Sequence, residues 1–251
     1  LVRSRGLGDV YKRQSHMFPA VLPSLYASLL TFPTAFSMTK KKIKKKNRKD
    51  FDIEMTYKHI VFDFGNVLAK FDPDYLLGQF CDNKEAFPLL SDILFEHWDE
   101  LDAGTITPEM ARAEAISKTP TAYQNLVLRF FEEWYRHLLP LEDTWKFIRE
   151  LKEQGYGLYI LSNAPVDFAE HAADCYEITS LFDGIVFSAP IKMAKPQPEI
   201  YHHLFHTYHL SPADCFFLDD KPENIQAAKD AGMDGLVFTG DIDIVKERIG
   251  F

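Results

Sequence analysis

Short apolar runs alternate with amphipathic helical segments along most of the chain. Continuous apolar runs of five to seven residues are typical of parallel strands that are buried on both faces. Such runs occupy residues 59–64, 157–163, 184–188, 215–220 and 235–239. Helical periodicity marks residues 144–154, 166–175, 198–209 and 222–231. We therefore expect an α/β fold with a doubly wound, parallel, Rossmann-like sheet that is covered by helices on both faces.

The region 74–140 interrupts this alternation and contains only helical segments. These segments are predicted at residues 75–80, 88–98, 107–118 and 121–137. Thr107 followed by Pro108 is a good helix start, because threonine is a favourable N-cap and proline is favourable at the first helical position. We expect an α/β core formed by 55–73 and 141–251, with 74–140 inserted between the first and second strands.

Polar residues follow the apolar runs at the ends of several predicted strands. The carboxyl ends of parallel strands meet at one edge of a sheet, where binding sites of such folds lie. We therefore expect these side chains to lie close together. In chain order they are Asp63, Ser162, Asn163, Asp219 and Asp220, with Lys195 preceding a helix in AKPQPEIY.

Each of these residue types has a chemical reason to be present. An aspartate at a strand end is a rigidly held nucleophile or metal ligand, and Asp219 and Asp220 supply the oxygen ligands that Mg²⁺ prefers. The Ser162 hydroxyl and nearby backbone N–H groups can hold phosphate oxygens, and Lys195 can balance negative charge. Singly, each residue is explained as well by a helix cap or a turn. Together they predict phosphoryl transfer through an aspartyl-phosphate.

The order of these motifs resembles the haloacid dehalogenase-like (HAD) hydrolase superfamily. The resemblance covers residues 57–239 and is carried by the segments FDFGNVL, ILSNAP, AKPQPEIY and FLDDKPENIQAAKDAGM. Within the superfamily, the D-x-G-N-V form is similar to a bacterial branch that includes an α-D-glucose-1-phosphate phosphatase. The phosphatase domain of epoxide hydrolases lies close to this branch.

The resemblance implies a HAD-like core and a role for each motif residue. Asp63 would be the nucleophile and would also bind Mg²⁺, with the backbone carbonyl of Gly65 as a second ligand. Asp220 would bind the metal directly, and Asp219 would support it. The phosphoryl oxygens would be held by Ser162 and Asn163, and Lys195 would neutralise charge. Region 74–140 would be a helical cap that closes over a small phosphorylated substrate and excludes water.

The sequence departs from the superfamily pattern at Gly65. Most phosphatases of this superfamily carry a second aspartate at that position, where it acts as general acid and base. A proton-transfer group contributes ~10²–10⁴-fold to the rate. Its absence favours leaving groups that need little protonation, such as an anomeric phosphate, and a sugar phosphate is therefore the expected substrate.

Two other functions fit the same motifs. A 2-haloacid dehalogenase attacks carbon and needs no Mg²⁺, whereas the adjacent Asp219 and Asp220 are unfavourable without a cation between them. This favours the phosphatase. A catalytically weakened binding or regulatory protein is the other alternative, and the retention of Asp63, Ser162 and Lys195 argues against it.

Charge and composition limit the partners. Residues 55–251 carry 16 basic and 33 acidic residues. This acidic balance argues against binding to nucleic acid, although a bound metal ion can make the local charge positive and so attract a small anion.

The three cysteines, Cys81, Cys175 and Cys215, match no zinc spacing and no disulfide framework. We therefore expect them to be small buried hydrophobic residues in a reducing, cytoplasmic protein.

Histidines and aromatic residues offer two further candidates. His202 and His206 lie four residues apart on one helix, but no carboxylate or cysteine is spaced to complete a metal site. A solvated helix face is the better interpretation. For Trp98, Trp134 and the Phe130-Phe131 pair, packing between the inserted helices is favoured over lining a substrate pocket.

Residues 1–54 differ from the rest of the chain. They hold 12 basic and 4 acidic residues, and an apolar stretch at 17–38 precedes a lysine-rich run. Three prolines in that stretch disfavour a spanning helix, and the order is the reverse of a signal peptide. The opening LVRSRGLGDVYKRQ resembles translated sequencing-adapter sequence. We expect a non-native or disordered extension, and a folded protein from Met55 that is a monomer or homodimer without membrane contact.

Overall fold

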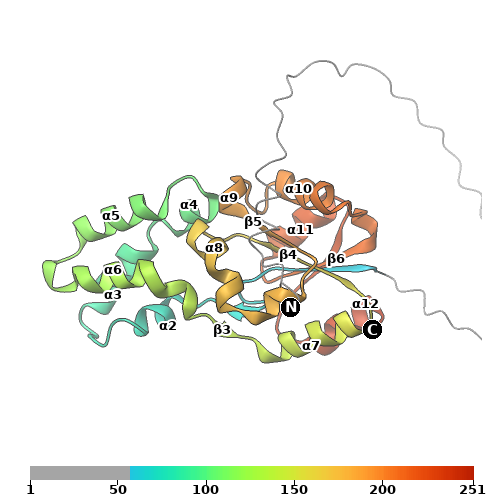
Figure 1. The fold of residues 1–251 in the computed structure, drawn as a ribbon, viewed down its shortest axis with the longest axis horizontal. Coiled ribbons are helices and arrows are strands. Elements are labelled where there is room, and N and C mark those ends of the chain that lie inside the picture. The colour runs from blue at the N-terminus through green and yellow to red at the C-terminus, as the bar shows by residue number, and fades with distance from the viewer. Residues whose placement is uncertain (1–56) are drawn as a thin grey trace, which may run out of the picture.

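A five-stranded parallel sheet forms the centre of the computed structural model, which describes residues 57–251 (Figure 1). The strands lie in the order β5–β4–β1–β6–β7. Their bounds are His59–Phe62 for β1, Gly157–Ser162 for β4, Gly184–Phe187 for β5, Cys215–Asp219 for β6 and Asp234–Val237 for β7. The predicted doubly wound parallel sheet is confirmed. The expectation for residues 1–54 lies outside the described residues.

Helices cover both faces of this sheet. One face packs against α7 (Glu142–Glu153), α8 (Val166–Cys175) and α12 (Ile242–Ile249), and the other against α10 (Pro198–Tyr208) and α11 (Pro222–Asp230) (Figure 1). In β1, Ile60 and Phe62 belong to the first core, and Val61 belongs to the second. Successive side chains of a strand point to opposite faces. The strands are therefore apolar at consecutive positions because both faces are buried.

The remaining helices form a group beside the sheet, and the chain enters and leaves it through a short antiparallel ribbon (Figure 1). The ribbon consists of β2 (Ala69–Lys70) and β3 (Leu139–Pro140). The helices of the group are α2 (Pro73–Gly78), α3 (Phe87–Phe95), α4 (Trp98–Ala103), α5 (Pro108–Lys118) and α6 (Gln124–Glu133). Short helical turns lie at Thr121–Tyr123, Trp134–Arg136, Glu177–Leu181 and Pro212–Asp214, and the short helix α9 spans Ser188–Ile191.

Several element boundaries differ from the prediction. The expected helix at 88–98 is two helices, because His97 leaves the helical conformation with φ −110° and ψ 26°. Helix α12 and the ribbon were not predicted. Asp241 caps α12 by accepting hydrogen bonds from the backbone N–H groups of Asp243 and Ile244. The predicted cap at Thr107 is confirmed, since its side chain accepts from the N–H of Met110.

Within residues 57–251, no helix is long and apolar enough to cross a membrane.

The three cysteines are free thiols, and Cys81 and Cys215 are buried as predicted, whereas Cys175 is half-buried. Burial raises the pKa of the Cys215 thiol to about 12, which keeps it protonated and unreactive.

Helix α4 is held against the sheet by a close backbone contact. Gly104 ends α4 in the left-handed conformation, with φ 66°. A Cβ atom at this position would overlap the backbone carbonyl of Ala189 in α9. Ser188 is the first residue of α9, directly after β5, and its hydroxyl donates a hydrogen bond to the backbone carbonyl of Asp102. The inserted helices are thereby anchored at the carboxyl edge of the sheet.

Replacing Gly104 tests this anchor. We expect Gly104→Ala to lower the free energy of unfolding by at least ~1–2 kcal/mol, since a Cβ is unfavourable in the left-handed conformation and here also overlaps Ala189. Urea unfolding measures the loss. Gly78→Ala is the matched control, because a Cβ at Gly78 meets nothing within 4 Å, and its effect should stay within ~1 kcal/mol. Equal losses in the two variants would contradict the anchor.

Candidate active site

Neighbouring strands bring the predicted polar residues together at the carboxyl edge of the sheet. Asp63 directly follows β1, Ser162 is the last residue of β4, and Asp219 is the last residue of β6. The strands β4, β1 and β6 are adjacent in the sheet. Three segments that are far apart in the sequence therefore end side by side, at the point where the chain reverses its direction of winding.

Lys195 links two of these carboxylates. Its Nζ atom lies 2.8 Å from Oδ1 of Asp63 and 2.6 Å from Oδ2 of Asp219, and its side chain is 1% exposed. The backbone of Lys195 is held by the side chain of Asn163. The Lys195 N–H donates to Oδ1 of Asn163 at 2.8 Å, and Nδ2 of Asn163 donates to the Lys195 carbonyl at 2.9 Å. The loop before α10 is thereby fixed to the end of β4.

Burial and charge shift the ionisation of this group. Burial raises the pKa of Asp63 to about 6, although the positive charge of Lys195 opposes this and the nearby carboxylate of Asp219 adds to it. A hydrogen bond from Ser162 favours the ionised form. For Lys195, burial disfavours the charged form, but attraction to the two carboxylates outweighs this and raises its pKa. Lys195 is therefore charged at neutral pH.

Asp219 is fully buried, and both of its oxygens accept hydrogen bonds. Oδ1 accepts from the backbone N–H of Lys221 at 2.8 Å and from Nδ2 of Asn224 at 3.0 Å. Oδ2 accepts from Nδ2 of Asn224 at 3.0 Å and from Lys195. Asp219 therefore holds Lys195 and Asn224 in place. From the sequence, Asn224 was part of the matching motif, in its spacing after Asp219 and Asp220, but no role was predicted for it.

Asn66 joins the loop after β1 to the loop after β6. Its Nδ2 donates to Oδ2 of Asp220 at 2.9 Å, and its Oδ1 accepts from the backbone N–H of Phe71 at 3.1 Å. Asn66 has φ 56°, a left-handed conformation that asparagine tolerates better than most residues. No role for Asn66 was predicted from the sequence. The Gly65-Asn66 pair was a signal for the turn, but not for its contact with Asp220.

The three aspartates fit a divalent metal ion. One carboxylate oxygen from each of Asp63, Asp219 and Asp220 lies within 4.8 Å of the other two. Lys195 is the single cation that is paired with this group in the described residues. Three carboxylates and one lysine leave an excess of two negative charges, which one divalent cation would balance. Oxygen donors of this kind are suited to Mg²⁺.

A cavity of about 210 Å³ lies over these residues and is lined by both the core and the inserted helices. Its polar lining includes Asp63, Ser162 and Lys195, and its aromatic lining includes Trp98 and Trp134. The favoured packing between the inserted helices is observed, but both tryptophans also line the cavity, which was the less favoured alternative. They do contact each other, with ring centroids 4.7 Å apart, and their remaining surfaces face the cavity.

The other aromatic residues behave as expected. Phe130 and Phe131 are buried in the apolar core and do not line the cavity. Trp134 is oriented by a hydrogen bond from its Nε1 to Oδ2 of Asp167 at 2.8 Å and by stacking on Phe168. Two different contacts therefore fix the ring that faces the site.

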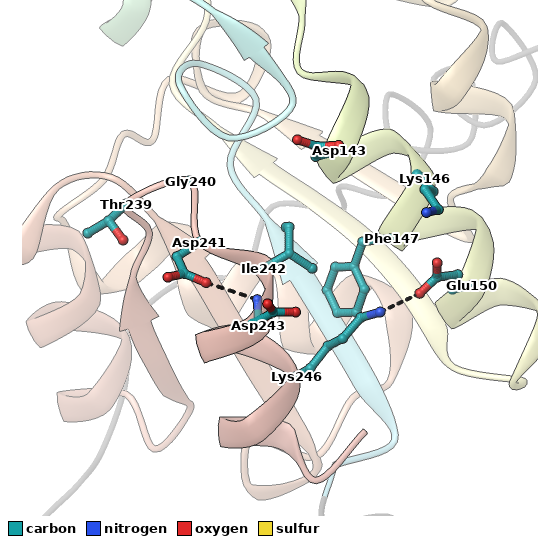
Figure 2. Close-up of a pocket in the computed structure, with 10 residues that line it drawn as sticks. All are labelled: Asp143, Lys146, Phe147, Glu150, Thr239, Gly240, Asp241, Ile242, Asp243 and Lys246. Atoms are coloured by element: carbon teal, nitrogen blue, oxygen red, sulfur yellow. Dashed lines mark hydrogen bonds and ion pairs between the residues drawn. The ribbon is translucent and has the colours of Figure 1, made fainter.

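A second hollow, of about 570 Å³, lies between α7 and α12 (Figure 2). It is open and lined mainly by charged residues such as Asp143 and Asp243. Lys246 pairs with Glu150 at 2.6 Å across it (Figure 2). It contains none of the residues from the ends of β1, β4 and β6. The chemistry predicted from the sequence therefore belongs to the smaller cavity.

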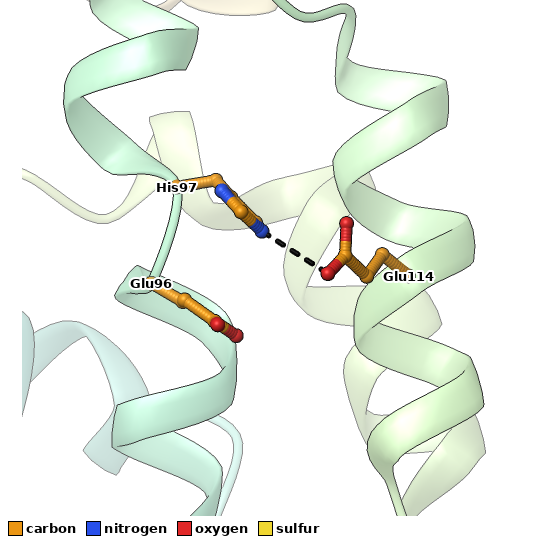
Figure 3. A group of neighbouring side chains, drawn as sticks. All are labelled: Glu96, His97 and Glu114. Atoms are coloured by element: carbon orange, nitrogen blue, oxygen red, sulfur yellow. Dashed lines mark ion pairs between the residues drawn. The ribbon is translucent and has the colours of Figure 1, made fainter.

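Another acidic cluster lies among the inserted helices. Glu96, His97 and Glu114 face one another, with Nε2 of His97 3.3 Å from Oε1 of Glu114 (Figure 3). Lys118 lies 2.6 Å from Glu96 and 2.8 Å from Glu114. A lysine thus supplies the positive charge, and the cluster is an exposed ion-pair network.

Comparison with known proteins agrees with this architecture. The profile of the haloacid dehalogenase-like hydrolases matches residues 57–232. The chain therefore belongs to the haloacid dehalogenase-like hydrolase family, as its motifs predicted, and is a hydrolase.

Individual relatives extend this comparison. A sesquiterpene phosphatase from Aspergillus oryzae is 30% identical over 188 residues, which are 74% of this chain and 92% of that protein. The mouse bifunctional epoxide hydrolase 2 is 33% identical over 87 residues, which are 33% of this chain and 16% of that protein.

Solved structures share the fold. A HAD family enzyme from Bacteroides thetaiotaomicron, in complex with magnesium and inorganic phosphate, superimposes with a TM-score of 0.59 at 22% identity over 73% of this chain and 95% of that one. An L-2-haloacid dehalogenase from Xanthobacter autotrophicus, with chloropropionic acid covalently bound, gives a TM-score of 0.53 at 16% identity over 71% and 76% of the two chains.

Replacing Lys195 tests the charge balance of the site. In the presence of a chelator, we expect Lys195→Met to lower the free energy of unfolding by ~3–5 kcal/mol, because buried carboxylates lose their counter-charge. The loss should be larger at pH 8 than at pH 5. Burial raises the pKa of Asp63 to about 6 and the charge of Lys195 opposes this rise. Without the lysine, the Asp63 carboxylate therefore binds its proton more tightly in the folded than in the unfolded chain, so stability falls as pH rises.

The control for this prediction is an exposed pair. Lys152 lies 2.7 Å from Asp183, and both side chains are more than a third exposed. Lys152→Met should cost at most ~1 kcal/mol. Urea unfolding of both variants at the two pH values measures the difference. A loss that is the same in both variants, or independent of pH for Lys195→Met, would contradict the proposed balance.

Proposed function

We propose that this chain is a Mg²⁺-dependent phosphatase that hydrolyses a small phosphorylated metabolite through an aspartyl-phosphate. The charge balance of the site supports this proposal above all. The three clustered aspartates exceed their one lysine by two negative charges. A site of that charge attracts a divalent cation, and the cation in turn makes the site attractive to a phosphate dianion.

Asp63 is the proposed nucleophile. It lies at the end of β1, where the central strand of the sheet restrains its backbone, and the backbone N–H of Phe64 donates to its Oδ1 at 2.7 Å. Attack on phosphorus forms a bond to a carboxylate oxygen of Asp63 and releases the alcohol. A water molecule then hydrolyses the acyl phosphate and restores the carboxylate.

The other residues of the site position the phosphoryl group and balance its charge. Ser162 would donate its hydroxyl to a phosphoryl oxygen, and Lys195 would attract the negative charge of the group. Because the side chain of Asn163 is bound to the backbone of Lys195, its contribution would come from its backbone N–H. Asn163 also positions Lys195.

The metal ion would be held by Asp63, by the backbone carbonyl of Gly65 and by Asp220. Asp219 would support this arrangement indirectly, since its oxygens already accept hydrogen bonds from Lys195 and Asn224. When bound, Mg²⁺ supplies positive charge that stabilises the charge on the transferring phosphoryl group.

Residues 74–140 would act as a helical cap. Trp98 on α4 and Trp134 near the end of the inserted region line the same cavity as Asp63. A cap that contributes side chains to the cavity excludes water and determines which leaving groups fit. The cap therefore belongs to the substrate site and not only to the scaffold.

A panel of candidate substrates tests the function. We expect phosphate release from sugar phosphates, nucleotides or prenyl phosphates in the presence of Mg²⁺, and loss of this activity with chelator or in Asp63→Asn. Asp74→Asn, an exposed aspartate on α2, should retain full activity. Chloroacetate tests the dehalogenase alternative. Phosphate release that survives chelation, or chloride release by the wild type, would overturn the proposal.

The cavity lining favours one refinement of the substrate. The missing second aspartate predicts a sugar phosphate, but the side of the cavity formed by Phe71, Trp98, Trp134 and Leu138 is apolar. A sugar would leave its hydroxyl groups facing this surface without hydrogen bonds. An apolar alcohol would bury its hydrocarbon there, and the similarity to a sesquiterpene phosphatase supports this candidate.

Kinetic comparison separates the two substrate classes. If the apolar candidate is correct, kcat/KM for farnesyl phosphate exceeds that for glucose 1-phosphate. Trp98→Ala should then lower kcat/KM for farnesyl phosphate by ~10-fold or more, which corresponds to ~1.4 kcal/mol of lost contact, and affect the sugar phosphate less. Leu89→Ala removes an apolar side chain that is exposed on α3 and serves as the control. A preference for the sugar phosphate that Trp98→Ala does not change would exclude the apolar candidate.

A further inference from the structure

The cavity contains a carboxyl group that no part of the proposed mechanism has used. Asp102 lies near the end of α4, in the inserted helices, and lines the same cavity as Asp63. Its Oδ1 atom is buried and has no hydrogen-bond partner among the described residues. Buried polar atoms without a partner are rare in folded proteins, and where they occur they often belong to functional sites.

The position of Asp102 is determined by the anchor of α4. Its backbone carbonyl accepts a hydrogen bond from the Ser188 hydroxyl. Two residues later, the backbone of Gly104 packs directly on Ala189. The carboxyl group is therefore held at the edge of the sheet by contacts of its own backbone. A catalytic group needs this kind of restraint to meet the reacting atoms.

The surroundings of Asp102 raise the pKa of its carboxyl group. Burial raises its pKa to about 7. Lys221 lowers this pKa, the negative charges of Asp63 and Asp99 raise it, and Lys195 lowers it. The group therefore carries a proton up to about neutral pH, and it can also accept one near the same pH. A catalytic acid and base needs a pKa near the working pH.

Asp167 is a second buried carboxyl group, and it differs from Asp102 because it is held in a structural hydrogen bond and lies outside the cavity lining. Asp167 also has an oxygen without a partner, but its other oxygen accepts from Trp134 at 2.8 Å. Asp167 does not line the cavity, and its task is to orient the Trp134 ring. For Asp102, no side-chain hydrogen bond occurs in the described part of the chain, and the cavity is open to it.

We propose that Asp102 is the general acid and base of this enzyme and takes the place of the second aspartate that the family pattern has at Gly65. This proposal rests on the proposed phosphatase function. As Asp63 attacks phosphorus and the bond to the leaving oxygen breaks, the Asp102 carboxyl group donates its proton to that oxygen and releases an alcohol. The Asp102 carboxylate then takes a proton from the water that attacks the acyl phosphate. Inorganic phosphate leaves, the Asp63 carboxylate is restored, and Asp102 is again protonated.

Leaving-group dependence tests this role. p-Nitrophenolate leaves without protonation, whereas an alkoxide does not. We expect Asp102→Asn to lower kcat/KM for an alkyl phosphate by ~10²-fold or more, the lower end of the usual contribution of a catalytic acid, and to change kcat/KM for p-nitrophenyl phosphate far less. Glu100→Gln, which removes a carboxylate from the same helix outside the cavity lining, should change neither value.

The pH profile gives a second readout. For the wild type, kcat/KM with the alkyl phosphate should fall as pH rises through about 7, since Asp102 loses the proton that it donates. This fall should be absent in Asp102→Asn, because asparagine does not titrate. A merely structural role of Asp102 predicts the same pH profile in both proteins.

A rescue experiment uses the position that lacks the acid. Within 4 Å, a Cβ at Gly65 meets only Cβ of Phe71, at 3.8 Å, which is an ordinary van der Waals contact, so a side chain can begin there without a clash. In the Asp102→Asn background, Gly65→Asp should restore activity on the alkyl phosphate. Structural damage from the loss of Asp102 would not be repaired in this way. Urea unfolding of the single Gly65→Asp variant is the control that shows whether the fold tolerates the new carboxyl group.

The outcomes distinguish a failure of the proposed phosphatase function from a failure of the proposed role of Asp102. If Asp63→Asn retains phosphatase activity, the proposed function itself fails. If the wild type is active and Asp63→Asn is inactive, but Asp102→Asn lowers the alkyl and aryl phosphates equally or leaves both unchanged, the role of Asp102 is overturned. If the single Gly65→Asp variant is folded as stably as the wild type but Gly65→Asp restores no activity to Asp102→Asn, the role of Asp102 is also overturned.

Discussion

The buried charge of Lys195 is the constraint on which the rest of the site depends. A lysine that is removed from water is stable only if its charge is paired, and the two carboxylates within 2.8 Å satisfy this requirement. Asp219 in turn needs Asn224 and the N–H of Lys221 to saturate its oxygens. Adjacent parallel strands place both carboxylates at one edge of the sheet. The strand order therefore makes the pairing with Lys195 possible, and that pairing in turn stabilises the carboxylates at this edge.

The second constraint is the contact between the inserted helices and the core. The close approach of α4 to α9 at Gly104, with the hydrogen bond from Ser188 to Asp102, places helical residues over the strand ends. The same contact brings an apolar surface and a buried carboxyl group into one cavity with the charged group of the core. In the proposed function, the inserted helices supply specificity and proton transfer, while the core supplies the nucleophile and the groups that bind phosphate. With Asp102 as the proposed proton donor, the same division gives a chain with glycine at position 65 an acid in its site.

Much of the fold follows from local patterns. Strands that are buried on both faces have consecutive apolar residues, and strand ends are marked by a change to polar residues, so the five strands and their polar ends could be predicted. Helix α8 was predicted with its observed bounds, and the start at Thr107 follows from cap chemistry. The break at His97 and the ribbon β2–β3 could not be predicted, because both depend on contacts between distant segments. The ribbon has two residues in each strand, which is too short for any periodicity.

The sequence by itself determined the family, the core fold and the residues at the strand ends, since these depend on hydrophobic periodicity and on a fixed order of motifs. Only the tertiary structure decided what those residues contact: Asn163 holds Lys195, Asp219 is saturated by Asn224, and Asn66 reaches Asp220. It also decided that Trp98, Trp134 and Asp102 face the cavity. These residues lie in the inserted helical region, where the hydrophobic pattern shows which side of a helix is buried. It does not show which other element covers that side. The physical reason is that a side chain's environment is set by the packing of elements far apart in the sequence, and no local pattern encodes that packing.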